Sequence, residues 1–305
     1  MYVSPTLFPF FDGLIPEGWL LDLSVRNWKL DPRDRDAGVV SRWHRRCARR
    51  FFAGSAVPEI SITTDDLESF ARRNVQAGLT VPGVQWKMPL HLADVAGIRT
   101  VPHGLVHLAS GERAYITRRV DRDGSTRLPM EDLCQLSERL THDKYRSSCE
   151  QCGKTIGRYS DRPGLDLADY FYLLLFCFVT GNADMHLNNF SLIRGTGGWV
   201  LAPAYDLLPT NLLIPDDRDE TALTINGKRS RPRYRDFLAC GQTIGLTDTV
   251  INRLTARIVE RAHRFPETIE RSHISPENRN ALRRLVAARV EVLRDVTNRD
   301  PVAQG

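Results

Sequence analysis

The spacing of apolar and polar positions changes along the chain. In the first part, apolar and polar residues alternate over Val101–His107 and Ala114–Val120, which predicts two strands. From residue 130 onward, apolar residues recur at helical spacing. Helices are predicted over residues 130–140, 148–159, 165–180 and 276–298, with a hairpin over 192–201. A β-rich first part before a helical second part predicts an α+β, two-lobed architecture.

The segment before Val101 is more irregular. A strand-turn-strand is predicted over residues 79–92, around Pro82 and Gly83, and a short helix over 90–97. Free backbone N–H groups in such a turn can hold phosphates. The charged stretch at 31–38 indicates a linker. We therefore expect three parts: residues 1–40, a β-rich lobe over 41–122, and a helical lobe over 123–305.

One loop carries the strongest candidate chemistry. Gly181 and Asn182 are predicted to end the preceding helix, so Asp184 and Asn189, five residues apart, fall in the loop that follows. Asp206 follows 17 residues after Asn189. Phosphoryl transfer needs an Asp that orients or deprotonates a hydroxyl, and an Asn and a second Asp that hold Mg²⁺. The spacing predicts these roles for Asp184, Asn189 and Asp206.

A metal-dependent hydrolase is a competing interpretation of the same loop. Asp184, His186 and Asp206 could hold a transition metal through carboxylate and imidazole groups. His142 and His263 lie in unrelated helical contexts and supply no third ligand nitrogen. We therefore favour a packing or hydrogen-bonding role for His186.

Composition and charge narrow the class of protein. The chain has 305 residues, 42% hydrophobic and 26% charged, which is typical of a globular protein with a large core. Its formal charge of +5 favours contact with nucleotides, nucleic acid or an acidic protein. Two arginine clusters, at 42–50 and 229–235, lack interleaved aromatic residues, so solvated or phosphate-contacting faces are expected there.

The pattern of cysteines and the hydropathy of the chain indicate the cellular compartment. The six cysteines are scattered, which predicts thiols, and the Cys149-x-x-Cys152 pair has no second pair to complete a zinc site. The apolar run 171–180 is too short to span a bilayer, and the first eleven residues lack a basic region. We expect a cytoplasmic protein without membrane contact.

Four motifs together resemble the HipA family. They are Leu79–Lys87, Tyr115–Arg122, Gly181–Phe190 and Leu201–Asp206. The family comprises bacterial serine/threonine protein kinases, the toxins of type II toxin–antitoxin systems, with a kinase-like C-terminal domain. The resemblance extends over most of residues 42–295.

The resemblance implies a site and its partners. Asp184 would be the catalytic base, and Asn189 and Asp206 would bind Mg²⁺. ATP would be held by the phosphate loop and by the backbone of a strand ending near Val120; the residues implied are Thr80, Gly83, Val84, Gln85 and Val120. ATP and Mg²⁺ are the implied cofactors. A protein substrate, a small DNA-binding antitoxin and indirect association with DNA are the implied partners.

The chain also departs from the family pattern. Only residues 88–92 separate Lys87 from the predicted helix, which is too short for the family's lysine-bearing strand and its return. Residues 11–18 resemble the tail of the family's small N-terminal subdomain, so 1–40 would be its remnant. A shortened N-terminal lobe follows from these departures. The alternative function is a catalytically impaired remnant that binds nucleotide or antitoxin.

Overall fold

The computed structural model describes residues 88–107, 113–117, 119–123, 126–214 and 218–294. The chain divides into two compact units, one with residues 1–81 and 137–143, the other with 82–136 and 144–305. In the first unit the described stretch contains a 3₁₀ helix, η3 (Thr141–Asp143). The second unit contains all the other described elements.

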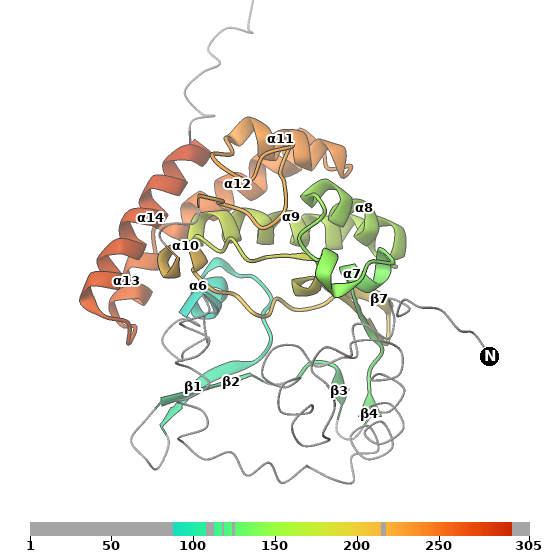
Figure 1. The fold of residues 1–305 in the computed structure, drawn as a ribbon, viewed down its shortest axis with the longest axis horizontal. Coiled ribbons are helices and arrows are strands. Elements are labelled where there is room, and N and C mark those ends of the chain that lie inside the picture. Colours follow the sequence, from blue (N-terminus) through green and yellow to red (C-terminus); the bar gives the residue numbers. More distant parts are fainter. Residues whose placement is uncertain (1–87, 108–112, 118, 124–125, 215–217, 295–305) are drawn as a thin grey trace, which may run out of the picture. The chain divides into compact units, whose positions relative to one another are not determined.

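Helices dominate the second unit (Figure 1). Its helices are α6 (Met88–Ala96), α7 (Leu133–Leu136), α8 (Cys149–Tyr159), α9 (Pro163–Thr180), η4 (Leu187–Asn189), α10 (Thr210–Leu213), α11 (Tyr234–Thr243), α12 (Asp248–Ala262), α13 (Phe265–Glu270) and α14 (Pro276–Arg294). Its strands are β1 (His103–His107), β2 (Arg113–Thr117), β3 (Arg122–Asp123), β4 (Thr126–Arg127), β5 (Met130–Asp132), β6 (Ser191–Gly195) and β7 (Gly198–Leu201).

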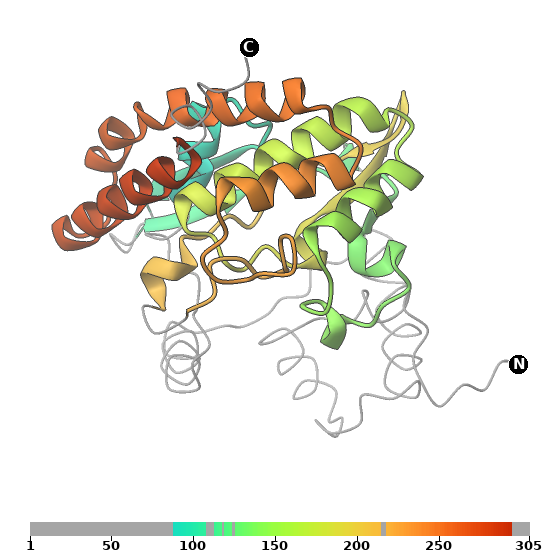
Figure 2. The ribbon, with the colours of Figure 1, turned by 90° about the horizontal axis from the view of Figure 1, so that it is seen from above.

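Helix α9 is the centre of the core. Pro163 occupies its first turn, where a missing N–H costs nothing, and every residue from Tyr170 to Thr180 is buried. It packs against α8, α12 and α14, which run alongside it in Figures 1 and 2. By length and composition alone this helix could cross a membrane, but 67% of it is buried inside the protein. Its apolar surface is therefore used in the core.

Small antiparallel sheets complete the second unit. Strands β5, β6 and β7 form one sheet in that order, and β6 and β7 are joined by a tight hairpin. Strands β1 and β2 form a second hairpin with His103 opposite Thr117, and β3 pairs with β4. The hairpin predicted over 192–201 is confirmed. The two strands predicted over 101–107 and 114–120 are confirmed as the pair β1 and β2.

The short helix predicted over 90–97 is confirmed as α6, whereas the strand predicted to run to residue 92, the start of the helix predicted over 130–140 and the end of the strand predicted over 114–120 were wrong. Residues 88–92 are helical, because their apolar side chains are buried on the same helix, α6, as Ala93 and Ala96. Pro89 lies in the first turn of this helix, where proline is tolerated. Residues 130–132 form strand β5, and the helix after them ends at Leu136. Strand β2 ends at Thr117, so Val120 lies in a turn.

The error at residues 130–132 comes from pairing with a distant strand. Met130, Glu131 and Asp132 pair with Ile193, Leu192 and Ser191 of β6, and this ladder overrides their helical spacing. Asp132 then starts α7: its Oδ1 accepts from the N–H of Gln135, while Gln135 Oε1 accepts from the N–H of Asp132.

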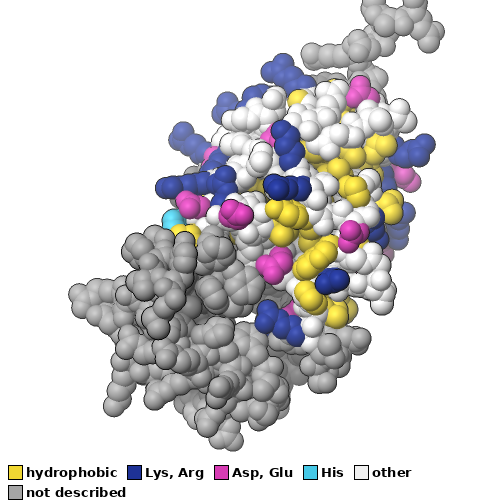
Figure 3. All heavy atoms as spheres, turned by 90° about the vertical axis from the view of Figure 1, so that its right-hand side faces the viewer, with side chains coloured by type: hydrophobic (Ala, Val, Ile, Leu, Met, Phe, Trp, Pro, Cys, Tyr) yellow, Lys and Arg dark blue, Asp and Glu magenta, His cyan; other side chains and the backbone are white. Residues whose placement is uncertain are grey.

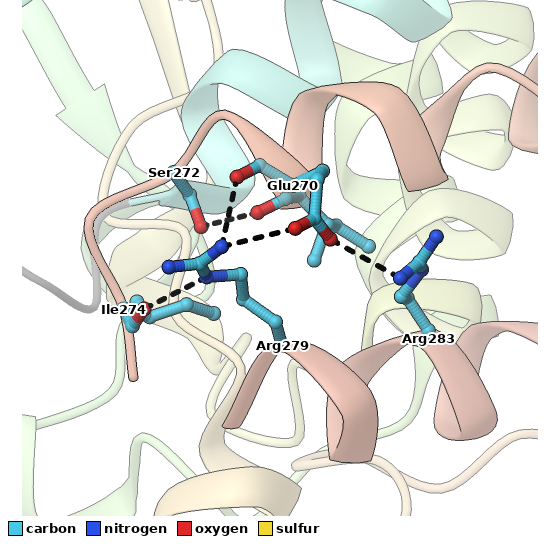
Figure 4. Close-up of polar contacts among 6 residues, drawn as sticks. Glu270, Ser272, Ile274, Arg279 and Arg283 are labelled. Atoms are coloured by element: carbon cyan, nitrogen blue, oxygen red, sulfur yellow. Dashed lines mark hydrogen bonds and ion pairs between the residues drawn. The ribbon is translucent and has the colours of Figure 1, made fainter. Parts of the chain in front are cut away.

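The turn between α13 and α14 is held by one carboxylate (Figure 4). Arg279 Nη1 donates to both the backbone oxygen and Oε1 of Glu270, at 3.1 Å each, and Arg283 Nη1 lies 3.1 Å from Glu270 Oε2. Arg279 Nε also donates to Ile274 O at 3.0 Å. These contacts join the end of α13 and the turn after it to the first part of α14.

The surface carries mixed charge. On the face drawn in Figure 3, the Lys and Arg side chains of the described residues are dispersed among acidic and apolar side chains. Among the described residues on this face, the basic side chains therefore do not form a single stripe of the kind that tracks a nucleic-acid backbone.

Candidate functional site

Gly181 directs the chain from α9 into the candidate loop. Its φ of 70° is left-handed, and its N–H bonds back to Cys177 and Phe178 carbonyls of the last helical turn. A Cβ at this position would lie 2.4 Å from Leu285 Cδ2 of α14. Glycine therefore satisfies both the backbone angle and the close approach of α14, and the prediction that the helix ends here is confirmed.

The loop closes on Asp184. The backbone oxygen of Asp184 accepts from His186 N at 2.9 Å and from Asn189 Nδ2 at 2.8 Å. Asn182 Oδ1 accepts from Asp184 N at 3.2 Å. The structure thus joins Asp184 and Asn189 within one loop, through the backbone oxygen of Asp184 and the side-chain N–H of Asn189.

The segment 201–206 is tied to this loop through Tyr205. Tyr205 Oη donates to Asn188 O at 2.7 Å, and Ser191 Oγ lies 2.6 Å from the same hydroxyl. Burial raises the pKa of Tyr205, which therefore stays protonated as a donor. The bond joins Asn188 to Tyr205, and the next residues in the chain are Asn189 and Asp206. The segments that carry Asn189 and Asp206 are therefore bonded to each other.

Asp206 itself has an unusual backbone. Its φ is 51°, in the left-handed region that non-glycine residues seldom adopt, and its side chain is exposed. Such strain is held in place by the surrounding structure and concentrates at functional sites. Carboxylate and amide oxygens, the groups that Asp206 and Asn189 carry, are the ligands that a hard cation such as Mg²⁺ prefers.

A buried carboxylate fixes the strand that leads to Asp206. Asp166 is fully buried, and its Oδ2 accepts from Leu201 N at 2.8 Å and from Ser160 Oγ at 2.6 Å. Arg162 Nη2 lies 3.1 Å from Asp166 Oδ1. Asp166 thereby connects the first turn of α9 to the end of β7.

Tyr145 contacts the carboxylate of Asp184. Its Oη donates to Asp184 Oδ1 at 2.7 Å, and its ring meets that of His186 edge to face with centroids 5.0 Å apart. Lys144 Nζ lies 5.5 Å from the Tyr145 ring centroid, and Arg229 Nη2 donates to Tyr145 O. Sequence reasoning missed Tyr145 and Lys144, since they lie about 40 residues before the loop and no local pattern marks them.

His186 is a neutral, buried imidazole. Burial and the nearby charge of Lys144 lower its pKa to about 4, against an opposing influence of Asp206. Among the described residues, Asp184, His186 and Asp206 do not form a group of three ligands that could share one metal ion. The geometry therefore supports the packing role for His186 over the hydrolase interpretation.

The other predicted site residues, those expected to bind ATP, are not part of this loop. Thr80, Gly83, Val84 and Gln85 lie outside the described residues, and Val120 lies in the turn before β3. Helix α6 begins at Met88, directly after Lys87, so residues 88–96 contain no lysine-bearing strand.

Comparison with known proteins places this site in a family. The family described as HipA-like C-terminal domain matches residues 87–265, more than half of the chain. The protein named "Putative kinase Y4mE" of Sinorhizobium fredii is 35% identical over 130 residues, which are 40% of this chain and 30% of that relative. The chain spans about a third of the length of the first curated relatives it matches.

Solved structures show the same fold. HipA of Shewanella oneidensis MR-1, in a complex with HipB and operator DNA, matches with a TM-score of 0.70 at 17% identity, covering 92% of this chain and 84% of that one. The proinflammatory kinase CtkA of Helicobacter pylori matches with a TM-score of 0.51 at 14% identity, covering 68% and 84%. The predicted α+β, HipA-type kinase fold with a helical C-terminal part is confirmed, and the chain belongs to the family of HipA-like proteins.

Proposed function

We propose that this protein is a HipA-like serine/threonine protein kinase that transfers the γ-phosphate of ATP to a hydroxyl of a protein substrate. The observation that carries the proposal is the joining of Asp184 to Asn189 within one loop, with Asp206 on the segment bonded to it. This is the set of side chains that phosphoryl transfer requires.

Asp184 has the geometry of a base that receives a hydroxyl proton. The Tyr145 hydroxyl, 2.7 Å from Asp184 Oδ1, marks a position from which an O–H group reaches this carboxylate. Tyr145 is 39% exposed, so it can yield this position to a substrate hydroxyl. As the substrate oxygen bonds to the γ-phosphorus and the bond to the β-phosphate oxygen breaks, the hydroxyl proton passes to Asp184.

Asn189 and Asp206 would hold Mg²⁺, which would neutralise charge on the phosphates when bound. The neutral His186, whose ring packs against Tyr145, adds no positive charge to this loop. The loop is anchored to α10, where Thr210 Oγ1 accepts from Ala183 N at 2.7 Å. This anchoring supports a fixed position of Asp184 relative to the metal ligands.

Partners follow from the family and from the HipA complex with HipB and DNA. We propose a toxin role in a toxin–antitoxin system in the cytoplasm, with a small DNA-binding antitoxin as partner and association with DNA through it. A second candidate function is a nucleotide- or antitoxin-binding remnant. It is favoured by the start of α6 directly after Lys87, because loss of the ATP lysine would slow transfer.

The two functions are separated by incubating the full chain with γ-labelled ATP, Mg²⁺ and a cell lysate. A kinase labels a protein, and the label is lost in both Asp184→Asn and Asp206→Asn. Asp161→Asn is the matched control, since Asp161 is an exposed carboxylate bonded to Trp199 N outside the loop. ATP-dependent thermal stabilisation without transfer indicates the remnant. Label that persists in Asp184→Asn contradicts the proposed mechanism.

A further inference from the structure

A second group of ligand-type side chains lies away from the catalytic loop, where α6 meets β1. His91 and Asp94 are three residues apart on α6 and therefore share one helix face. His103 is the first residue of β1, and its side chain is only 4% exposed. One ligand atom from each of the three lies within 4.8 Å of the others.

The separations match the edges of a small coordination shell. His103 Nε2 lies 3.3 Å from His91 Nδ1 and 3.2 Å from Asp94 Oδ2. In a tetrahedral zinc site, bonds of about 2.0–2.1 Å place neighbouring ligand atoms about 3.3 Å apart. Two edges that meet at His103 thus already have the length that a zinc-sized ion requires.

The surrounding hydrogen bonds orient these ligands. His103 Nδ1 lies 2.9 Å from Val101 O, so this nitrogen carries the proton and donates it to the carbonyl. The Nε2 lone pair then faces His91 and Asp94. Thr100 Oγ1 donates to Asp94 Oδ1 at 2.7 Å, so that Oδ2 is the carboxylate oxygen that faces His103. Metal-ligating histidines and carboxylates are held by outer contacts of this kind.

Three ligand atoms therefore converge on one point. His103 Nε2 lies next to both His91 Nδ1 and Asp94 Oδ2, so a cation placed among them would use all three ligand atoms.

We propose that His91, Asp94 and His103 bind a divalent transition metal of the Zn²⁺ type. Two imidazole nitrogens and one carboxylate oxygen suit Zn²⁺ and its neighbours, whereas Mg²⁺ prefers oxygen ligands. Asp94 is 51% exposed, so the ion enters from the solvent side and water completes its coordination. The ion would link α6, which packs on α9, α12 and α13, to the β1–β2 hairpin.

The test is a Zn²⁺ titration of the purified, chelator-stripped full chain against a chromophoric competitor. One ion per chain is expected, with affinity lowered about a hundredfold or more in His91→Ala and Asp94→Ala. Thr100→Val keeps the shape of the side chain but removes the outer hydrogen bond, and it is expected to weaken binding about tenfold. Bound Co²⁺ is expected to give the visible absorption of a four-coordinate, histidine-ligated site.

Two controls identify the site. Asp206→Asn removes a carboxylate of the candidate kinase site, and His273→Ala removes an exposed histidine; both variants should bind Zn²⁺ as tightly as the unmodified chain. Circular dichroism of each variant checks that it folds. Absence of stoichiometric binding, unchanged affinity in folded Asp94→Ala, or loss of binding in Asp206→Asn would each overturn the proposal. None of these outcomes depends on kinase activity.

Discussion

Folding changes the proton affinity of His186 in the candidate loop. The imidazole is buried, and burial and the charge of Lys144 lower its pKa from 6.5 to about 4. An unfolded chain therefore binds a proton here between about pH 6.5 and 4, while the folded chain does not. His186 thus makes the folded state sensitive to acid in that range.

Stability is expected to fall as the pH drops from 7 toward 4. Above the pKa that His186 has in the unfolded chain, its burial does not change the pH dependence of stability. As the pH falls from there to the pKa of the folded state, the free energy of unfolding decreases by on the order of 3 kcal/mol. His186→Gln should flatten this part of the curve. Urea unfolding without added Mg²⁺, at several pH values, measures the slope. His273→Gln is the control, and an unchanged slope in His186→Gln would contradict the assignment.

Residues near one another in the chain were predicted well. Asp184 and Asn189 come together because backbone hydrogen bonds close a loop of a few residues, and such spacing is visible in the sequence. Tyr145 and Lys144 reach the same loop only through tertiary packing. Contacts of that range leave no periodic signal, so the sequence could not reveal them.

At the scale of elements, Gly181 joins α9 to the loop under α14. Gly181→Ala is expected to lower the free energy of unfolding by about 2–4 kcal/mol, through the left-handed backbone and the contact with Leu285. Gly227→Ala is a matched control, with a φ of 77° and open space around the new Cβ, and should cost about 1–2 kcal/mol. Equal losses in urea unfolding would show that the Leu285 contact is unimportant.

Asp166 connects α9 and β7 in a comparable way. Asp166→Ala removes two hydrogen bonds and an ion pair from a fully buried site and should destabilise the fold by about 2–4 kcal/mol. Asp161→Ala, which removes one exposed carboxylate bond to Trp199 N, should cost about 1 kcal/mol or less. Thermal unfolding of both variants checks the difference, and similar melting temperatures would refute it.

Helices were predicted correctly where a long apolar face or a capping residue marks them in the sequence. Helix α8 begins after Ser148, whose Oγ accepts from Gln151 N, and α9 and α14 follow their helical spacing. Helix spacing failed at 130–132, because only the partner strand β6 determines that these residues are extended. Strand pairing between residues about 60 apart is not encoded in local periodicity.

At the scale of the whole molecule, the described residues of the second unit share a hydrophobic core that spans α6 to α14. The resemblance and the change from alternating to helical spacing together predicted the fold class. The predicted division into residues 1–40, 41–122 and 123–305 stays a prediction, since most of the first 122 residues lie outside the description.

The described cysteines offer a test of this core. The side chains of Cys134, Cys149, Cys152, Cys177 and Cys240 are all buried, and burial raises the pKa of Cys177 and Cys240. In a Cys47→Ser variant, all five should resist a thiol reagent in native buffer and become reactive together as urea unfolds the chain. Mass spectrometry counts the labelled thiols. Rapid labelling of one thiol without urea would show that the core opens locally.

The left-handed backbone at Asp206 has a consequence for protein engineering. Glycine would adopt a φ of 51° without the strain that aspartate bears, so a screen for stability alone would favour glycine at this position. The same replacement would delete the carboxylate proposed to hold Mg²⁺. Selection for stability and selection for phosphoryl transfer therefore act in opposite directions on this one residue.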